Sequence, residues 1–434
     1  MRWGYRSVTE IGGRGVRNPR ILFVTDRVPA NDNGNGIRIA NVLEGLVNAG
    51  SVHVCLVDSS VGGARLELDA RFTSTVIRAR EWPRWTKPAW AVGRRPAGLR
   101  YRQMRALRQE AAAHTAFGRT PWDLIWCSRA RVHMLTRSLI DGPRVVDLDD
   151  LNDRLLRTEM RDRRDRFGYS KTVPRNIIDW LDARRWQALQ QNIASEVDRV
   201  VVCSGLDRDR LAVANAAVVP NGYRISDAPA DAPARLTVPC AIPEGHPSLL
   251  FVGPLTYEPN RLAVQWVLDE VLPLVRASIP DVSFVVVGDD EGVSFRGAHA
   301  SEVLCLGRVD DVTPYYERAT VAVTPLHSGG GTRLKVIEAL ARRVPLVSTS
   351  FGFEGLDVRP SRDLLVADDP AAFASACLAI VKEEGLRSRL VESGFDQYRS
   401  RLTAAATSDA VRQLAVELLT TGRRVSAPGG RARA

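Results

Sequence analysis

Residues 319–341 run from an apolar strand through three glycines into a helix. Residues 319–325 (ATVAVTP) form an apolar run of strand length, and residues 334–341 have the apolar spacing of a helix. Gly329, Gly330 and Gly331 lie between them. An α/β sheet binds its ligands beyond the carboxyl ends of its strands, so this order indicates an α/β fold with a ligand at the glycines.

The residues after the glycines favour an anionic ligand. Backbone N–H groups in a glycine-rich turn can face an anion, and the dipole of the helix that follows adds favourable potential. Thr332, Arg333, Lys335 and Glu338 supply a hydroxyl, two cations and a carboxylate. A flexible surface turn, with Glu338 facing solvent, is the alternative interpretation.

Strands alternate with helices twice along the chain, which predicts two doubly wound α/β units. We expect strands at 20–25, 52–57, 124–127, 144–148, 200–203 and 217–219, then at 248–252, 282–287, 303–306, 321–324 and 344–348. Helices are expected at 37–49, 175–195, 261–277, 334–341 and 404–419. A stretch rich in Ala, Pro and Asp separates the units, so the predicted domains are 18–222 and 247–400, joined by a linker at 223–246.

The composition of the 434 residues, 45% hydrophobic and 25% charged, is that of a globular protein. No apolar stretch approaches the ~20 residues that cross a bilayer, and no signal sequence is evident, so we expect a cytoplasmic protein. The six cysteines stand singly among apolar neighbours, and no Cys/His cluster suggests a metal. No cofactor is expected, and residues 421–434 are expected to be a disordered tail.

The basic charge lies in the first half of the chain. The first 246 residues carry 39 Lys and Arg against 27 Asp and Glu, whereas the remainder carries 21 against 23. Aromatic residues alternate with arginines from Trp82 to Arg108, a pattern that suits an anionic membrane surface or single-stranded nucleic acid. A solvated loop is equally compatible. Because no nucleic-acid module is visible, the membrane surface is preferred, at the inner face of the plasma membrane.

Four segments together resemble a known family. They are SEVDRVVVCSGLDRDRL with VVPNGY before the linker, FVGPLTYEPN from Phe251, VVVGDD from Val285, and the run from Leu306 through GGGTRLKVIEA. In order and spacing they resemble the retaining glycosyltransferases of family 4, which have the GT-B fold of two Rossmann-like domains facing a cleft. The last segment is similar to a bacterial subset that carries GGGTRLKVIEA. The resemblance covers residues 20–401 and implies that a helix at 401–420 crosses back to the first domain.

The resemblance implies that a nucleotide-diphosphate-sugar lies against the second domain. Glu338 would hold the ribose hydroxyls, and Arg333 or Lys335 would neutralise the leaving diphosphate without a metal. The remaining donor-binding candidates are Gly253, Gly288, Arg308, Val309, His327, Gly329, Gly330, Gly331, Thr332 and Leu334. A plain loop at the end of a strand is the alternative for Arg308 and Val309.

The sequence departs from the family pattern at two places. The family pairs the ribose glutamate with another glutamate eight positions earlier, where this chain has Gly330. The usual cations after the first strand of the second domain are replaced by Pro254 and Pro259. Contacts to the donor sugar and diphosphate are therefore expected to differ from those of common members.

Two groups in the first domain are candidates for the acceptor side of the reaction. Gly34, Asn35 and Gly36 open a helix where the family brings acceptor and donor phosphate together, although NGNG is also a strong turn signal. Asp149 and Asp150 follow a strand where relatives carry a histidine, and either is a candidate to orient or deprotonate the acceptor hydroxyl. For Asp150, capping of the helix that starts at Leu151 is the alternative.

We therefore expect an enzyme that moves a sugar from a nucleotide donor to an acceptor hydroxyl with retention. The expected acceptor is a glycan or lipid-linked precursor in bacterial cell-surface glycan or glycolipid synthesis. A scaffold that binds a nucleotide-sugar without turnover is the first alternative, because of Gly330, Pro254 and Pro259. A basic nucleic-acid binder is the second, and its binding would depend strongly on salt.

Overall fold

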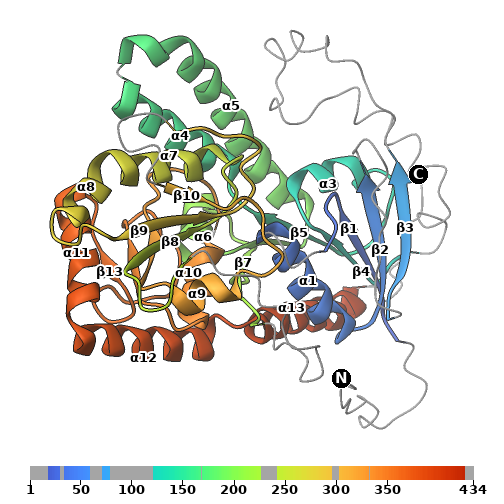
Figure 1. Ribbon diagram of the computed structural model, residues 1–434. Helices are drawn as coiled ribbons and strands as arrows, with labels where there is room; N and C mark the ends of the chain where they lie inside the picture. The colour runs from blue at the N-terminus through green and yellow to red at the C-terminus, as the bar shows by residue number, and fades with distance from the viewer. Residues whose placement is uncertain are drawn as a thin grey trace, which may run out of the picture.

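The computed structural model of the chain contains two parallel β-sheets, one in each half of the sequence (Figure 1). It describes residues 18–29, 34–58, 71–78, 121–167, 169–225, 242–295, 303–331 and 333–425. The predicted membrane-binding segment from Trp82 to Arg108 lies outside these ranges. The two sheets confirm the predicted fold class, a GT-B arrangement of two Rossmann-like units.

The first sheet has seven strands in the order β3-β2-β1-β4-β5-β6-β7. The strands are β1 (Arg20–Thr25), β2 (Ser51–Asp58), β3 (Thr73–Arg78), β4 (Leu124–Cys127), β5 (Arg144–Asp149), β6 (Arg199–Val202) and β7 (Ala216–Val218). The helices of this half are α1 (Gly34–Val47), α3 (Ala130–Thr136), α4 (Asn152–Phe167), α5 (Tyr169–Glu196) and α6 (Gly205–Leu211). The strand order reverses between β1 and β4, which creates a crevice beyond their carboxyl ends.

The second sheet has six strands in the order β10-β9-β8-β11-β12-β13. The strands are β8 (Ser248–Val252), β9 (Ser283–Val287), β10 (Val303–Cys305), β11 (Val321–Thr324), β12 (Leu346–Ser348) and β13 (Leu365–Val366). The helices are α7 (Glu258–Trp266), the π-helical turn η3 (Val267–Val271), α8 (Leu272–Arg276), α9 (Thr313–Arg318), α10 (Leu334–Ala341), α11 (Pro370–Lys382), α12 (Glu384–Arg401) and α13 (Ala404–Val425). Here the order reverses between β8 and β11, and the glycines follow β11.

Both sheets are buried on their two faces, as parallel sheets generally are. Phe23 and Trp126 are fully buried in the first sheet, and Phe251 and Phe284 are fully buried in the second. Burying one such side chain contributes ~1.5–3 kcal/mol, so the two cores dominate the stability of the fold. The sheets position the site because α4 follows the carboxyl end of β5 in the first sheet and the glycines follow the carboxyl end of β11 in the second.

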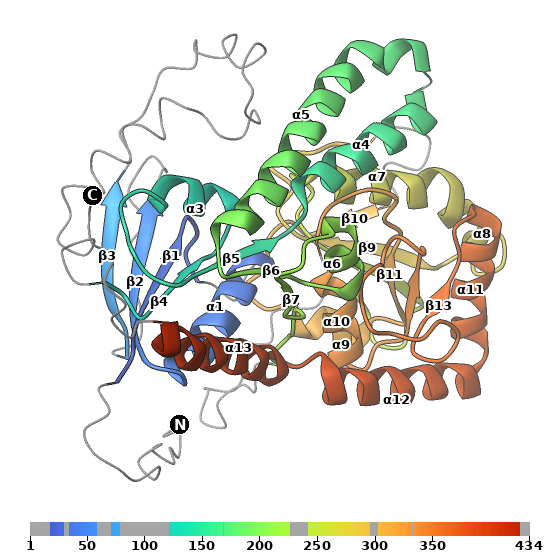
Figure 2. The ribbon, with the colours of Figure 1, turned by 180° about the vertical axis from the view of Figure 1, so that it is seen from behind.

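The last two helices run along the bottom of the molecule from the second half to the first (Figure 2). The chain passes between the halves twice, near Tyr223 and near residues 402–404. These two segments lie side by side, because the N–H of Tyr223 donates to Leu402 O (2.9 Å) and the N–H of Ala404 donates to Tyr223 O (2.9 Å). Beyond them, α13 packs on α1, and Ser408 Oγ donates to Asn41 O (2.9 Å). The first core is therefore completed by the C-terminal helix.

The apolar runs located most elements within two residues. The bounds expected for β1, β4, β8, β11 and α10 are those observed. By contrast, α1 begins at Gly34 rather than residue 37, so the NGNG glycines lie in its first turn. Helix α13 continues to Val425, so the first five residues of the expected tail are helical. No strand was predicted at β3 or β13 and no helix at α3, α6, α9, α11 or α12, and the helix at α4 was considered only as the one that Asp150 would cap.

Replacing Gly45 by valine should loosen the contact between α1 and α13. A Cβ at Gly45 would collide with Ser408 O and lie 2.7 Å from Val411 Cβ. Overpacking of this kind costs ~1–3 kcal/mol of unfolding free energy, measurable by urea denaturation. Gly205→Ala is the control, because a Cβ there meets nothing within 4 Å. Equal stability of the two variants would contradict the packing assigned to Gly45.

Candidate active site

The glycine loop, residues 328–331, lies against helix α4 of the first half. Thr158 Oγ1 donates to Gly329 O (3.2 Å) and accepts from the Gly329 N–H (3.1 Å). Ser328 Oγ donates to Asp162 Oδ2 (3.1 Å) in a buried contact. Because these bonds join the two halves of the chain, the loop belongs to their interface and is not a free surface turn.

The backbone of the loop needs glycine at two positions. Gly329 and Gly331 have φ values of 132° and 66°, a region that side chains disfavour. The Gly330 N–H donates to Tyr257 Oη (3.1 Å), which holds the loop from the second half. Thr332, the next predicted site residue, lies outside the described residues.

Asp150 approaches the glycine loop from the first half. Any side chain at Gly331 would collide with the Asp150 carboxylate, and a Cβ at Gly330 would lie 3.5 Å from Asp150 Oδ2. Helix α4 begins at Asn152, whose N–H donates to Gln190 Oε1 (3.0 Å) rather than to Asp150. Its side chain therefore contacts the loop instead of capping the helix.

Burial raises the pKa of Asp150 to about 7. The negative charges of Asp149 and Asp207 raise it further, whereas Arg129 and Arg333 lower it. A carboxylate with this pKa exchanges its proton near neutral pH, as groups in active sites often do.

Arg333 is a buried cation at the start of α10, with 7% of its surface exposed. Its guanidinium lies 4.3 Å from the centre of the Phe351 ring, and Nη1 donates to Gly331 O. Nη2 is buried and has no hydrogen-bond partner among the described residues. Burial lowers the pKa of Arg333, which reflects the cost of a charge without a counter-ion.

Lys335 is the second cation at this helix start. Its Nζ donates to Asn260 Oδ1 (2.7 Å) and lies 4.0 Å from the centre of the Phe251 ring. A Cβ at Gly253 would lie 2.9 Å from Lys335 Nζ, so that glycine makes room for the ammonium group. Burial, together with the charge of Arg333, lowers the pKa of Lys335 to about 7. An anion bound here would favour the protonated form.

Glu338 accepts hydrogen bonds from the first residue of the linker and from two residues of the second half. Tyr223 Oη donates to Oε1 (2.7 Å), Tyr316 Oη donates to Oε2 (3.3 Å), and Arg342 Nε donates to Oε1 (3.3 Å). Only 14% of the Glu338 side chain is exposed, so it is not an ordinary solvent-facing glutamate. Its carboxylate is oriented by the residues that join the two halves.

The remaining donor candidates lie at strand ends around these cations. Gly288 follows β9 with φ of 151°, and a Cβ there would collide with Gly253 O. Arg308 and Val309 follow β10, where Arg308 is exposed and Val309 is partly buried. His327 packs edge-on against Trp266, with ring centres 4.8 Å apart. Leu334 opens α10, and one of its methyl carbons would lie 3.2 Å from a Cβ at Gly34 of the first half.

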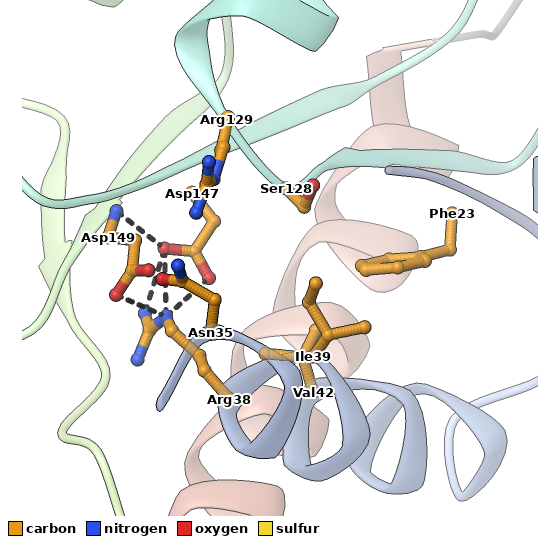
Figure 3. Close-up of a pocket in the computed structure, with 9 residues that line it drawn as sticks. All are labelled: Phe23, Asn35, Arg38, Ile39, Val42, Ser128, Arg129, Asp147 and Asp149. Carbon is orange, nitrogen blue, oxygen red and sulfur yellow. Dashed lines mark hydrogen bonds and ion pairs between the residues drawn. The ribbon is translucent and has the colours of Figure 1, made fainter. Parts of the chain in front are cut away.

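A small pocket of about 10 Å³ lies in the first half at the crevice between β1 and β4 (Figure 3). Arg38 of α1 contacts both oxygens of Asp147, at 2.8 Å and 3.1 Å, and donates to Asn221 Oδ1 (2.6 Å). Asp149 has φ of 56° and places Oδ1 3.5 Å from Arg38 Nε. The lining residues are Phe23, Asn35, Arg38, Ile39, Val42, Ser128, Arg129, Asp147 and Asp149.

The two aspartates predicted for the acceptor side therefore have different surroundings. Asp149 faces Arg38 in the first-half pocket, whereas Asp150 reaches the glycine loop of the second half. Four residues of the site were not predicted: Thr158, Tyr223, Tyr316 and Asn260. Tyr223, Tyr316 and Asn260 stand in segments that carry the family resemblance, but nothing local to them or to Thr158 reveals contacts with residues far along the chain.

Comparison with known proteins agrees with this geometry. Residues 246–383 match the family model described as glycosyl transferases group 1. A phosphatidyl-myo-inositol mannosyltransferase of Mycobacterium leprae is 27% identical over 218 residues, which cover 49% of this chain and 56% of that protein. An uncharacterized 44.6 kDa protein in the cps region of Klebsiella pneumoniae is 26% identical over 157 residues, covering 32% and 40%. The chain thus spans about half the length of these relatives.

Solved structures share the whole fold at low identity. Alpha,alpha-trehalose 6-phosphate synthase from Burkholderia multivorans has a TM-score of 0.65 at 14% identity, covering 96% of this chain and 100% of that one. HepE of Anabaena, in complex with UDP-glucose, has a TM-score of 0.58 at 13% identity, covering 93% and 99%. These likenesses define the class of protein, a two-domain chain of GT-B fold.

Residues 246–383 are thus similar to the group 1 glycosyltransferases, and the chain as a whole has their GT-B fold. No helix within the described ranges is long and apolar enough to span a membrane.

Asp150→Asn should be more stable than the wild type, and the difference in stability should grow as the pH rises from about 4 to 7. An unfolded aspartate titrates near ~3.9, whereas the folded pKa is about 7. The folded state therefore binds more protons in this window, and its stability falls as the pH rises through it. The asparagine side chain has no proton to lose, so the difference in melting temperature should grow and then level off above pH 7. A constant difference would contradict the raised pKa.

Proposed function

We propose that the chain transfers a sugar from a nucleotide-diphosphate-sugar to an acceptor hydroxyl, with retention of configuration. The observation that carries the proposal is the pair of cations at the start of α10, of which Arg333 has a buried nitrogen without a partner in the described part of the chain. A diphosphate placed there would meet Arg333, Lys335 and the N-terminus of the helix together. That arrangement stabilises the charge that develops as a diphosphate departs.

The contacts of Glu338 support the orientation of the donor. If the diphosphate lies at the helix start, Glu338 lies one turn further along α10, where it can accept hydrogen bonds from ribose hydroxyls. Tyr223 and Tyr316 hold its carboxylate in place. We propose UDP-glucose as the first donor to test, because HepE of Anabaena, which shares the fold, is described in complex with it.

The acceptor side is proposed from the first-half pocket. Asn35, Asp149 and Arg129 line a crevice at the reversal of strand order, where doubly wound sheets bind ligands. The relatives named for phosphatidyl-myo-inositol mannosyl transfer and for the cps region support a glycolipid or surface-glycan acceptor. A membrane-bound acceptor met at the inner face of the plasma membrane also agrees with the basic aromatic segment from Trp82 to Arg108.

Donor binding should raise the melting temperature of the protein. We expect one class of UDP-, GDP-, ADP- or dTDP-sugar to stabilise the wild type by about 2.7 kcal/mol at a hundred times its dissociation constant. Glu338→Gln should lose most of this shift, whereas Glu384→Gln, in the first turn of α12, is the matched control. If no nucleotide-sugar shifts the wild type, the proposed function is wrong.

Binding without turnover would favour the second candidate, an inactive nucleotide-sugar-binding scaffold. Gly330, Pro254 and Pro259 lack the polar groups that common family members carry at these positions, which is the observation in its favour. Donor hydrolysis and sugar transfer to membrane extract, measured with the donor that binds, separate the two candidates.

Lys335 should make diphosphate binding depend on pH. The ammonium group has a pKa of about 7 without ligand, and a bound diphosphate favours its charged form. Binding of UDP should therefore take up protons near pH 8, and the affinity should fall between pH 7 and 9. Calorimetry in buffers of different ionisation enthalpy measures this uptake. Lys335→Met should bind UDP with no proton uptake, while Lys382→Met at the far end of α11 serves as the control.

A further inference from the structure

On one side of the glycine loop, the second half supplies no side chains, and the side chains found there belong to the first half. Gly329, Gly330 and Gly331 project no side chains, and the nearest side-chain atoms to a Cβ at Gly330 are Leu155 Cβ (3.4 Å) and Asp150 Oδ2 (3.5 Å). Both residues come from the first half. Whatever ligand meets the loop next to Arg333 therefore also meets Asp150.

Asp150 and Arg333 leave complementary hydrogen-bonding capacity at this place. Within the described ranges, Asp150 forms no hydrogen bond and no ion pair within 4 Å, and Arg333 Nη2 has no partner. An unpaired guanidinium nitrogen donates to phosphate oxygens, and a carboxylate accepts from hydroxyl groups. A ligand that satisfies both carries a phosphate close to several hydroxyls, as a sugar diphosphate does.

We propose that Asp150 is the carboxylate that accepts hydrogen bonds from hydroxyl groups of the donor sugar, acting across the domain interface in place of a side chain at position 330. This inference rests on the proposed function. It assigns Asp150 to the donor, rather than to deprotonation of the acceptor, and it makes the sugar site complete only when α4 contacts the loop.

The contact geometry also suggests how the carboxylate can be moved. Gly331 tolerates no side chain, because its φ is 66° and Asp150 occupies the space. Gly330 is different, since its φ is not positive and its nearest neighbours would lie at 3.4 Å or more. Once Asp150 is shortened to alanine, a glutamate at position 330 can reach the vacated space from the opposite domain.

The test compares Asp150→Ala, Gly330→Glu and the double variant with the wild type. For each protein we would measure the dissociation constants of UDP and of the UDP-sugar, and the rate of UDP-sugar hydrolysis without acceptor. Asp150→Ala should leave UDP affinity within ~2-fold and lower kcat/KM for the UDP-sugar ~10- to 100-fold, the effect of losing hydrogen bonds to a charged group. Asp165→Ala, an exposed carboxylate on α4, is the matched control.

The double variant provides the decisive measurement. Glutamate at position 330 should recover most of the kcat/KM lost in Asp150→Ala, whereas Gly330→Glu alone should be poorly active because two carboxylates then share the space. Urea denaturation of each variant checks that its fold is retained. If Asp150 serves only to support the loop, a glutamate at position 330 is not expected to recover kcat/KM.

Three results would overturn the inference. Asp150→Ala could slow transfer to an acceptor yet leave donor affinity and hydrolysis unchanged, which would assign Asp150 to the acceptor. It could weaken UDP and UDP-sugar equally, which would mean a disturbed loop. The double variant could also fail to recover activity while folded. A wild type that binds no nucleotide-sugar would defeat the proposed function as well, whereas normal turnover by Asp150→Ala would defeat this inference alone.

Discussion

The site depends on a buried guanidinium that has no counter-ion in the described part of the chain. Removing a charge from water is costly, and a protein usually offsets the cost with a carboxylate in contact. Arg333 instead has the Phe351 ring, the Gly331 carbonyl and the distant charges of Asp150 and Asp207. Only 7% of the surface of Arg333 is exposed to solvent. In the proposed function, a diphosphate supplies the missing counter-charge.

The geometry of the loop explains the absence of side chains at two of its glycines. Gly329 and Gly331 have backbone angles that only glycine adopts readily, and Asp150 also fills the space beside Gly331. Bare backbone on one domain and a carboxylate on the other produce a single binding surface. Neither half of the chain contains that surface alone, which is why it lies at the interface.

The sequence predicted the sheets well because the buried strands are continuous apolar runs. Strands β1, β4, β8 and β11 are fully or almost fully buried, and their bounds follow from composition. The extent of helix α4 was not predicted, because ten of its sixteen residues are charged and it shows little apolar periodicity. The glycines, Arg333, Lys335 and Glu338 could be selected from local pattern. Their partners Thr158, Tyr223 and Asn260 could not, because those contacts depend on how distant segments meet.

The packing of α13 on α1 of the first half also affects how the chain can fold during synthesis. Val411, Leu414 and Leu418 belong to the same apolar core as Phe23 and Leu46, which are made almost four hundred residues earlier. The first half emerges from the ribosome with one face of α1 uncovered, and it stays so until the last helix arrives. Loss of α13 would thus expose apolar surface on the other half of the molecule, and the nascent first half would be open to aggregation or to chaperones until that helix has been made.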